Sequence, residues 1–542
     1  MDEKKKIFPL FVISFAIGFL LFAFAPLDLY FNNPLDYQYD MYCILKYMLP
    51  VMVLFLVLAL AISAAALKFK RVYKLLLCFF TGIYISLFVQ GNFFARNLPL
   101  LDGGEIHWEL YNNQRIYSLI IWLLPISLLL FVYFKKKAKC ETISEYIGIF
   151  GTIFIVISLV FTGISQNGFV KKDSIACTDE YMFDMSSDEN FVIFLVDTFD
   201  SELFTPMLDS NSKYVEDLED FTFYRNVVSG YPYTKPSIPF ILTGKWYENE
   251  EPFLDYCKQA FTSSPLFKEL SAQNYRMGFY DYDYTQVEGV PEMFENFSES
   301  GRMKNPILFI KMQLKLVGFK YLPYDLKKLC VLTPDNISFD SATTLNNGAN
   351  FSLYSNQFVY DEILNNDINI GAEKCFRYLY IVGAHEPFVI DENVQETENG
   401  SYELSVAASM KILNTYINKL KDAGVYDNSV IIILGDHGFN DYNAFGKQNP
   451  VLLIKGKNEH HEMNISDISI SQEDYQDAFL ELLSGTDGQS VFNKFEESER
   501  ERRHLFYTGD NLNNGLTEYI QYGWASDEET LLPTGKVYPV VY

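Results

Sequence analysis

The stretch Val430-Ile-Ile-Ile-Leu-Gly-Asp-His-Gly438 decides the fold. An unbroken run of apolar, mostly β-branched residues is typical of a strand that is buried on both faces, as in a parallel sheet. An acidic residue and a histidine follow at once, where such a strand should end. Sites in open parallel sheets gather at the carboxyl ends of the strands. The stretch therefore predicts a parallel sheet with a site at its edge, and it places Asp436 and His437 in that site.

Further apolar runs of strand length alternate with amphipathic segments on either side of this stretch. Strands are predicted at 191–196, 275–280, 376–382 and 450–454, and helices at 264–273, 303–316, 402–423 and 472–483. This alternation predicts an α/β domain with a largely parallel central sheet. Asp197 directly follows the first of these strands, and His385 follows the third. We therefore expect both at the same edge of the sheet as Asp436.

The stretch Tyr233-Thr-Lys-Pro-Ser-Ile-Pro-Phe-Ile-Leu-Thr-Gly244 predicts a short helix. Pro236 suits the first turn of a helix, and Gly244 suits its end. Thr234 would then lie at the N-terminus, where the helix dipole and free N–H groups favour an attacking oxyanion and an anionic ester. The alternative is that Thr234 only caps the helix, which is a common use of threonine.

The strand-end residues have the side chains of a metal site. Asp436 and His437 offer oxygen and nitrogen donors that suit Mn²⁺ or Zn²⁺, and Asp197 would add a second carboxylate. A divalent ion there would lower the pKa of the Thr234 hydroxyl and polarise a phosphoryl oxygen. His385 would donate a hydrogen bond to a substrate oxygen. From the residues alone, a set of helix caps and turns explains the same pattern equally well.

The N-terminal part holds five apolar runs, each close to the ~20 residues that a helix needs to cross a bilayer. They extend from Ile7 to about Ala25, from about Tyr47 to Leu67, from Leu75 to about Phe94, from Ile116 to Phe134 and from Ile147 to Ile164. Basic clusters precede the first run and lie between the second and third and between the fourth and fifth. Because basic loops stay in the cytoplasm, we expect a multi-pass plasma-membrane protein with a cytoplasmic N-terminus and an extracytoplasmic domain after residue 164.

Composition limits the partners. The net charge of −26 argues against nucleic acid, whose binding normally needs a basic patch. The seven cysteines include no C-x-x-C pair, which argues against a zinc knuckle. We expect the chain to divide into a membrane domain at 1–165, a linker at 166–190, an α/β domain at 191–500 that would carry the site, and an extension of unknown role at 501–542.

Four motifs in a fixed order resemble the sulfatase-like branch of the alkaline phosphatase superfamily. They are Asp197 after a strand, Thr234-x-Pro-Ser followed by Thr-Gly244, His385-x-Pro-Phe, and Asp436-His437-Gly. The resemblance covers roughly residues 190 to 485. The five-span anchor with an outer domain is similar in architecture to the lipoteichoic acid synthases and lipid A phosphoethanolamine transferases.

The resemblance implies a role for each motif. Thr234 would be the nucleophile and a metal ligand, Asp197, Asp436 and His437 the other ligands, and His385 a contact to the substrate phosphate. One divalent ion is implied, with Mn²⁺ as the first candidate and Zn²⁺ or Mg²⁺ as alternatives. The implied reaction moves a phosphoglycerol or phosphoethanolamine group from a phospholipid to a cell-surface glycan or lipid of a bacterial envelope, through a phospho-threonine.

The chain also departs from the sulfatase pattern. Sulfatases carry a Cys or Ser that matures to formylglycine where this chain has Thr234, and an Arg where it has Ile238. Formylglycine cannot form from threonine, which disfavours sulfate ester hydrolysis by that route. Thr198 replaces a second aspartate, which favours one metal ion, and we interpret Asp200 as a helix cap. Two alternatives stay open: a sulfatase-like hydrolase or phosphodiesterase that uses water, and a non-catalytic scaffold of a polysaccharide assembly system.

Overall fold

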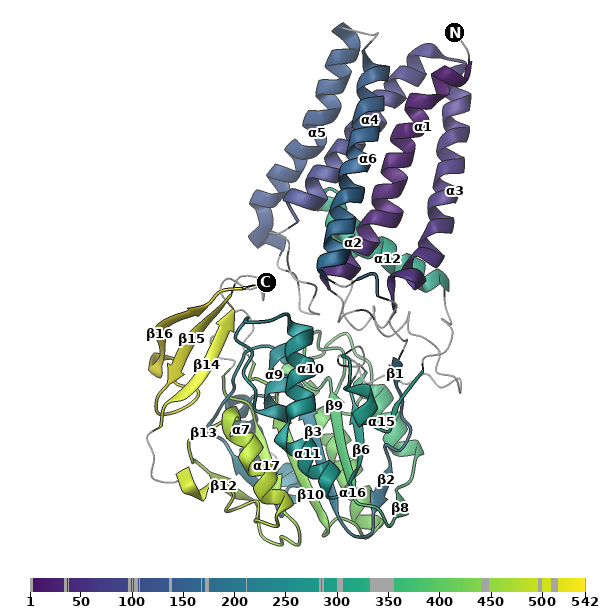
Figure 1. Cartoon of the computed structure of the whole chain (residues 1–542). Helices are drawn as coiled ribbons and strands as arrows, with labels where there is room; N and C mark the ends of the chain where they lie inside the picture. The colour runs from purple at the N-terminus through teal and green to yellow at the C-terminus, as the bar shows by residue number, and fades with distance from the viewer. Residues whose placement is uncertain are drawn as a thin grey trace. The chain divides into compact units, whose positions relative to one another are not determined.

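The structure is a computed structural model. It describes residues 3–33, 37, 39–95, 99, 101, 106, 108–135, 139–166, 168–170, 175–210, 212–281, 284, 287–299, 306–331, 355–439, 448–495, 500–507 and 515–541. The chain forms two compact units (Figure 1). Unit 1 comprises Met1–Ser174 and Ser300–Asn347, and unit 2 comprises Ile175–Glu299 and Gly348–Tyr542.

Unit 1 is a helical bundle. Its helices are α1 (Glu3–Phe19), η1 (Leu20–Phe24), α2 (Ala25–Asn32), α3 (Met41–Leu67), α4 (Lys70–Phe93), η3 (Trp108–Tyr111), α5 (Asn112–Lys135) and α6 (Cys140–Ser165). Within the described residues, five helical stretches are long and apolar enough to cross a membrane: Phe8–Asn32, Met41–Leu67, Lys70–Phe93, Trp108–Lys135 and Cys140–Ser165. The five predicted apolar spans are therefore helices, each somewhat longer than its apolar run.

The helix predicted at 303–316 also forms, and it belongs to unit 1. It is α12 (Pro306–Tyr321), followed by α13 (Tyr324–Lys327) and η5 (Lys328–Cys330). These residues lie inside the predicted catalytic segment 191–500, yet α12 packs against α2, α3 and α4. Hydropathy shows that a helix is apolar but does not show which apolar surface it contacts.

Unit 2 is built on a seven-stranded sheet in the order β12-β4-β11-β10-β3-β9-β6. Its strands are β3 (Asn190–Val196), β4 (Thr222–Tyr224), β6 (Arg276–Tyr280), β9 (Cys375–Ile381), β10 (Ser429–Gly435), β11 (Leu452–Lys455) and β12 (Asn464–Ser466). Of the described strands in this sheet, only β11 runs against the others. The predicted α/β fold with a largely parallel sheet is confirmed.

Helices cover both faces of this sheet. Phe191 of β3 contacts Phe479 of α17 (Tyr475–Leu483), whereas Phe194 contacts Tyr416 of α16 (Tyr402–Asp422). Successive side chains of a strand point to opposite faces, so residues 191 and 194 face opposite helices. The strands β3, β9 and β10 are completely buried, as their unbroken apolar sequences predict.

The remaining helices and turns of unit 2 lie around this sheet. They include α7 (Ser201–Ser210), α8 (Ser212–Asp217), α9 (Thr234–Thr243), α10 (Phe253–Ser263), α11 (Pro265–Ala272), α15 (Asn356–Asn365) and the turn η6 (Gln472–Asp474). Gly244 has a φ of 71° and ends α9, as the sequence predicts.

Short strands extend unit 2 at both ends of its sequence. In the predicted linker, β1 (Ile175–Cys177) pairs with β7 (Phe297–Glu299), and β2 (Asp184–Ser186) pairs with β8 (Asn369–Gly371). The extension 501–542 forms an antiparallel sheet of β14 (Arg502–Tyr507), β15 (Leu516–Gln521) and β16 (Leu531–Tyr538). Strand β14 also contacts β5 (Val227–Val228) and β13 (Ile470–Ser471), which pair with each other.

Candidate metal centre

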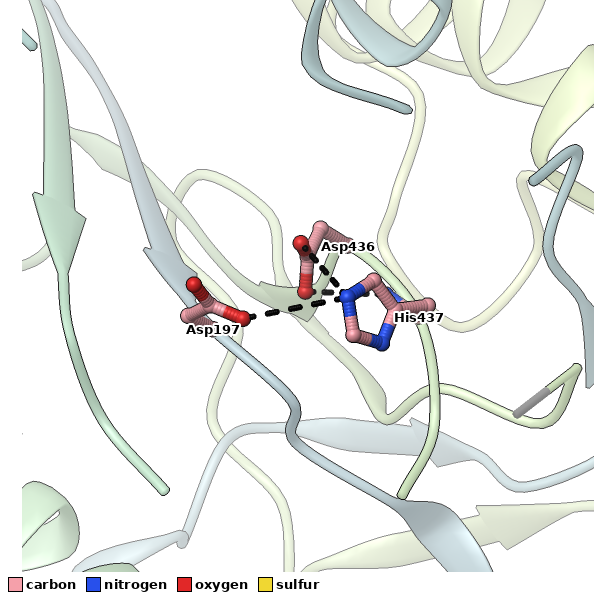
Figure 2. A group of neighbouring side chains, drawn as sticks. All are labelled: Asp197, Asp436 and His437. Atoms are coloured by element: carbon pink, nitrogen blue, oxygen red, sulfur yellow. Dashed lines mark hydrogen bonds and ion pairs between the residues drawn. The ribbon is translucent and has the colours of Figure 1, made fainter. Parts of the chain in front are cut away.

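Two neighbouring strands deliver the acidic residues of the candidate site. β3 and β10 are parallel and in register, with Val196 opposite Gly435. The next residue on each strand is an aspartate, so Asp197 and Asp436 leave the sheet side by side. His437 follows directly, and all three side chains are almost completely buried. Figure 2 shows the two carboxylates and the imidazole turned toward one another.

The three side chains are close enough to share one ion. One ligand atom from each of Asp197, Asp436 and His437 lies within 4.8 Å of the others. His437 Nε2 is 3.4 Å from Asp436 Oδ2 and 3.9 Å from Asp197 Oδ1. An imidazole nitrogen with two carboxylates is a donor set that binds Zn²⁺ or Mn²⁺.

Thr234 brings its hydroxyl to the same place. It is the first residue of α9, and the residue before it, Tyr233, occupies the N-cap position. Thr234 Oγ1 lies 3.3 Å from Asp197 Oδ2 and 3.4 Å from His437 Nε2. The hydroxyl therefore faces the acidic cluster. Thr234 is not the N-cap residue of α9, so the alternative that it only caps the helix does not hold.

Hydrogen bonds hold each of the three candidate ligand side chains in place. Asp436 Oδ1 accepts from the amides of Thr198 and His437, at 3.0 and 2.9 Å. Thr198 occupies the position of the second aspartate of the sulfatase pattern. It donates its hydroxyl to Asp197 Oδ1 at 2.7 Å. His437 Nδ1 lies 2.8 Å from the carbonyl of Gly438. Donation from Nδ1 leaves the lone pair of Nε2 directed at the carboxylates, which is the usual arrangement of a metal-binding histidine.

The electrostatics favour a bound cation. Burial raises the pKa of Asp197 above its ordinary value, and the neighbouring Asp436 carboxylate raises it further. Burial likewise raises the pKa of Asp436. Asp436 Oδ2 is buried and has no hydrogen-bond partner among the described residues. Two adjoining buried carboxylates are costly without a counter-charge, so this donor set fits a divalent ion.

A family model described as Sulfatase matches residues 189–484, more than half of the 542-residue chain. The chain belongs to the sulfatase family. The predicted relationship to sulfatase-like proteins is confirmed, and the sulfatase domain supports an enzymatic function. A search of curated proteins found no significant match.

Several solved structures resemble the sulfatase-family chain at a distance. Ps i-CgsB in complex with k-i-k-neocarrahexaose shares 16% identity, with 62% of this chain and 82% of that chain covered and a TM-score of 0.41. The phosphonate monoester hydrolase SpPMH from Silicibacter pomeroyi shares 13%, with 64% and 88% covered and a TM-score of 0.38. The lipoteichoic acid synthase LtaP from Listeria monocytogenes shares 13%, with 67% and 90% covered and a TM-score of 0.36. These likenesses are too weak to carry a functional argument.

Two more predicted residues lie beside the cluster in this sulfatase domain. His385 is half-buried, and its charge would lower the pKa of both Asp197 and Asp436 against the larger effect of burial. Asp200 Oδ1 accepts from the amide of Leu203 at 3.0 Å, in the first turn of α7, as a helix cap would. The metal-ligand and substrate roles of the sequence analysis remain predictions.

Tyr380 is a site residue that the sequence analysis missed. It lies in β9, and its hydroxyl donates to Asp197 Oδ2 at 2.6 Å. Strand β9 is the parallel neighbour of β3, with Leu195 opposite Tyr380, so the tyrosine reaches across one strand spacing. Its position one residue before the end of an apolar strand is the signal that could have revealed it.

The segment before Thr234 is held by residues that carry no motif. Gln472 of η6 accepts from the amide of Gly230 at 2.9 Å and donates to the carbonyl of Asp436 at 2.8 Å. Strand β14 adds a main-chain hydrogen bond of 2.8 Å from Leu505 to Gly230. Next to it, His504 Nδ1 contacts the carbonyl of Ser229. The sulfatase domain is thus contacted, just before Thr234, by a segment that lies outside the family match.

Proposed function

We propose that this protein is a membrane-anchored, metal-dependent phosphotransferase. It would move a phosphoglycerol or phosphoethanolamine group from a membrane phospholipid to a cell-surface glycan or lipid, through a phospho-threonine at Thr234. Asp197, Thr234, Asp436 and His437 would hold one divalent ion, with Mn²⁺ as the first candidate. His385 would contact the substrate phosphate. The setting would be the plasma membrane, with unit 2 outside the cell.

The position of the Thr234 hydroxyl carries this proposal. It lies within 3.4 Å of two candidate metal ligands, at the N-terminus of a helix. A bound divalent ion would lower the pKa of the hydroxyl and neutralise charge on the phosphoryl group. Threonine cannot mature to formylglycine, so the geometry supports direct attack on a phosphate ester by the Thr234 oxygen.

The reaction balances in two steps. Thr234 Oγ1 forms a bond to the phosphorus of the donor, and the bond from that phosphorus to the diacylglycerol oxygen breaks. The proton that Thr234 loses is matched by the proton that diacylglycerol gains. An acceptor hydroxyl then attacks the same phosphorus, the bond to Thr234 breaks, and the acceptor proton restores the threonine hydroxyl. His385 would stabilise the phosphoryl oxygens or the leaving oxygen in both steps.

The helical unit supports a lipid donor. Five helices suited to crossing a membrane would keep the enzyme in the plane where phospholipids are concentrated. Residues of α12 and α13 contact α2, the first turns of α3, the end of α4 and the start of α5. These are the ends that the basic loops predict to lie outside. A segment from between two parts of unit 2 therefore meets the bundle at its predicted outer end, which supports the proposed orientation.

Intact-mass analysis of the full chain tests the mechanism. The purified protein is incubated with phosphatidylglycerol or phosphatidylethanolamine and Mn²⁺, without an acceptor. We expect a phosphoglycerol or phosphoethanolamine adduct that maps to Thr234 and identifies the donor by its mass. Release of diacylglycerol while Thr234 remains unmodified would refute the covalent intermediate.

Membership of the sulfatase family also favours a second candidate, a hydrolase that uses water as the acceptor at the same site. Both reactions share the first step, so the fate of the labelled headgroup distinguishes them. Label on envelope glycan or lipid supports transfer, and label released only as free headgroup phosphate supports hydrolysis.

A further inference from the structure

The segment 306–330 connects unit 2 to the end of the helical bundle. It comprises α12, α13 and η5 and is enclosed in sequence by β7 and α15 of unit 2. Within unit 1, α12 lies across one end of the bundle rather than along it (Figure 1). It is thus placed where a helix parallel to a membrane surface would lie.

One face of α12 is firmly attached to the bundle. Phe309 is fully buried between the rings of Tyr39 and Tyr47, with centroids 4.9 and 5.5 Å away. Gln313 donates to the Tyr39 hydroxyl at 3.1 Å. Further along the helix, Lys320 forms an ion pair with Asp28. These contacts come from both the apolar and the polar side chains of one helix face, so they fix its rotation about its own axis.

The end of α12 is attached as well. Lys327 is fully buried, and its ammonium donates to the carbonyls of Phe319 and Lys320, in the last turn of the helix. The next turn continues onto the bundle, where Tyr324 donates its amide to Ser118 Oγ at 3.0 Å and its hydroxyl to the carbonyl of Trp108 at 2.6 Å. The segment is therefore a built part of unit 1.

The opposite face of the segment is apolar and exposed. Ile307 is 81% exposed, Leu329 is 73% exposed, and Leu314 and Leu326 are also exposed. Residues 307, 311 and 314 fall on one side of the helix by their spacing, and residue 311 is an exposed lysine. Exposed aliphatic side chains with an interspersed lysine are typical of a helix that lies in a membrane interface.

Aromatic and basic side chains mark the same level of the bundle. The Trp108 ring contacts Tyr324 edge-on at 5.4 Å and Phe319 at 6.3 Å. The ammonium of Lys328 lies 5.5 Å from the centre of the Trp108 ring. Trp and Tyr collect at the headgroup level of membrane proteins, and lysines there reach toward lipid phosphates. The exposed face of this segment and the aromatic and basic side chains therefore belong to the same end of the bundle.

We propose that residues 306–330 lie in the headgroup layer of the bilayer spanned by unit 1, with the side chains of Ile307, Leu314, Leu326 and Leu329 inserted among the lipids. The inference goes beyond the proposed function and does not depend on the transfer chemistry. It gives the chain of unit 2 a second attachment to the membrane, in addition to the segment that follows α6.

Photo-crosslinking of the full chain tests the proposal. Benzoylphenylalanine replaces Ile307, Leu314 or Leu329, one at a time, and the protein is reconstituted in vesicles of phosphatidylglycerol and phosphatidylcholine. Because these side chains are exposed, the replacement leaves the buried face of α12 intact. Leu123 in α5, which is 63% exposed, gives the adduct expected of a spanning helix, and Leu532 in unit 2 serves as the matched aqueous control.

After irradiation, we expect lipid-mass adducts at 307, 314 and 329, at no less than about a third of the yield at 123 and at least tenfold above the yield at 532. Crosslinks from these positions to peptides of unit 2 would overturn the proposal, because the face would then cover the catalytic unit. Crosslinks to a second copy of the chain, or no lipid adduct at 307 and 329 while 123 is labelled, would overturn it too.

Discussion

The strand ends of the central sheet and the C-terminal strand β14 hold the same site in different ways. At the strand ends, side chains of adjacent parallel strands meet, and their chemistry is visible in the residue types Asp197, Asp436 and His437. Strand β14 supports the segment before Thr234. Leu505 donates a main-chain hydrogen bond to Gly230, and the imidazole of His504 contacts the carbonyl of Ser229. Ligands need particular side chains, whereas support of a loop needs only a correctly placed backbone. Substitutions at Thr234, Tyr380, Gln472 and His504 test this difference between the two regions.

Removal of the proposed nucleophile should have the largest effect. We expect Thr234→Ala to lower phosphoryl transfer at least about a thousandfold, because no other group can form the bond to phosphorus. Transfer of labelled headgroup is the measurement. Thr243→Ala, at the other end of α9, is the matched control, because its hydroxyl donates to the carbonyl of Pro239 and accepts from the amide of Lys245, neither of which is a candidate site residue. Wild-type transfer by Thr234→Ala would refute the assignment.

Loss of the Tyr380 hydroxyl should weaken the metal site without removing a ligand. Tyr380→Phe deletes the hydrogen bond to Asp197, and such a loss typically lowers metal affinity about 10- to 100-fold. Mn²⁺ titration by calorimetry measures it. Tyr416→Phe is the control, since that buried hydroxyl donates to the carbonyl of Met182. Equal Mn²⁺ affinities in the two variants would mean that Tyr380 does not position Asp197.

Gln472 joins the two kinds of support, since it bonds to both Gly230 and Asp436. Gln472→Leu leaves buried main-chain groups unpaired, which should cost about 1–3 kcal/mol of stability. We expect kcat to fall about tenfold through misplacement of Thr234, with a smaller change in Mn²⁺ affinity. Gln476→Leu, one turn further on, is the control. A change in Mn²⁺ affinity without a change in kcat would show that Gln472 positions Asp436 but does not position Thr234.

His504 should give the smallest effect, seen in stability rather than rate. Burial lowers the pKa of His504 to about 4, against about 6.5 in an unfolded chain. As pH falls below 6.5, the unfolded chain gains a proton that the folded chain excludes, so the folded state loses stability. At pH 5.5 the loss should be about 1.4 kcal/mol.

The test is the change in Tm between pH 7.5 and 5.5 for the full chain and for His504→Gln. The variant should lose less stability over this range, because its side chain does not titrate. An identical pH dependence in both proteins would mean that His504 is not held neutral by burial.

The sequence predicts the strand-end half of the site well, for a physical reason. Buried parallel strands are continuous apolar runs, so their ends can be located, and polar residues there fall at one edge of the sheet. Asp197, Asp436 and His437 meet as this reasoning predicts, and Thr234 begins a helix that ends at Gly244. The five spans are predicted by the same logic of uninterrupted apolar length.

The other half of the site could not be predicted in this way. Nothing local to Gln472, Leu505 or His504 shows that they meet residues 229–230, because the contacts join segments more than 240 residues apart and partly use the backbone. The same limit applies to α12, since an apolar helix between strands of an α/β domain is ordinarily a covering helix of the sheet. Here its partners are Tyr39, Tyr47 and Gly91.

The return of residues 300–347 to the helical unit has a consequence for shedding by proteases. The chain passes between the two units three times, near residues 174, 299 and 347. A single cut after α6 would release an ordinary membrane-anchored ectodomain into the medium. In this protein the severed ectodomain would still carry α12, with Phe309 and Tyr321 packed in the bundle. If unit 2 lies outside the cell as proposed, three cuts would be needed to separate it covalently from the helical unit.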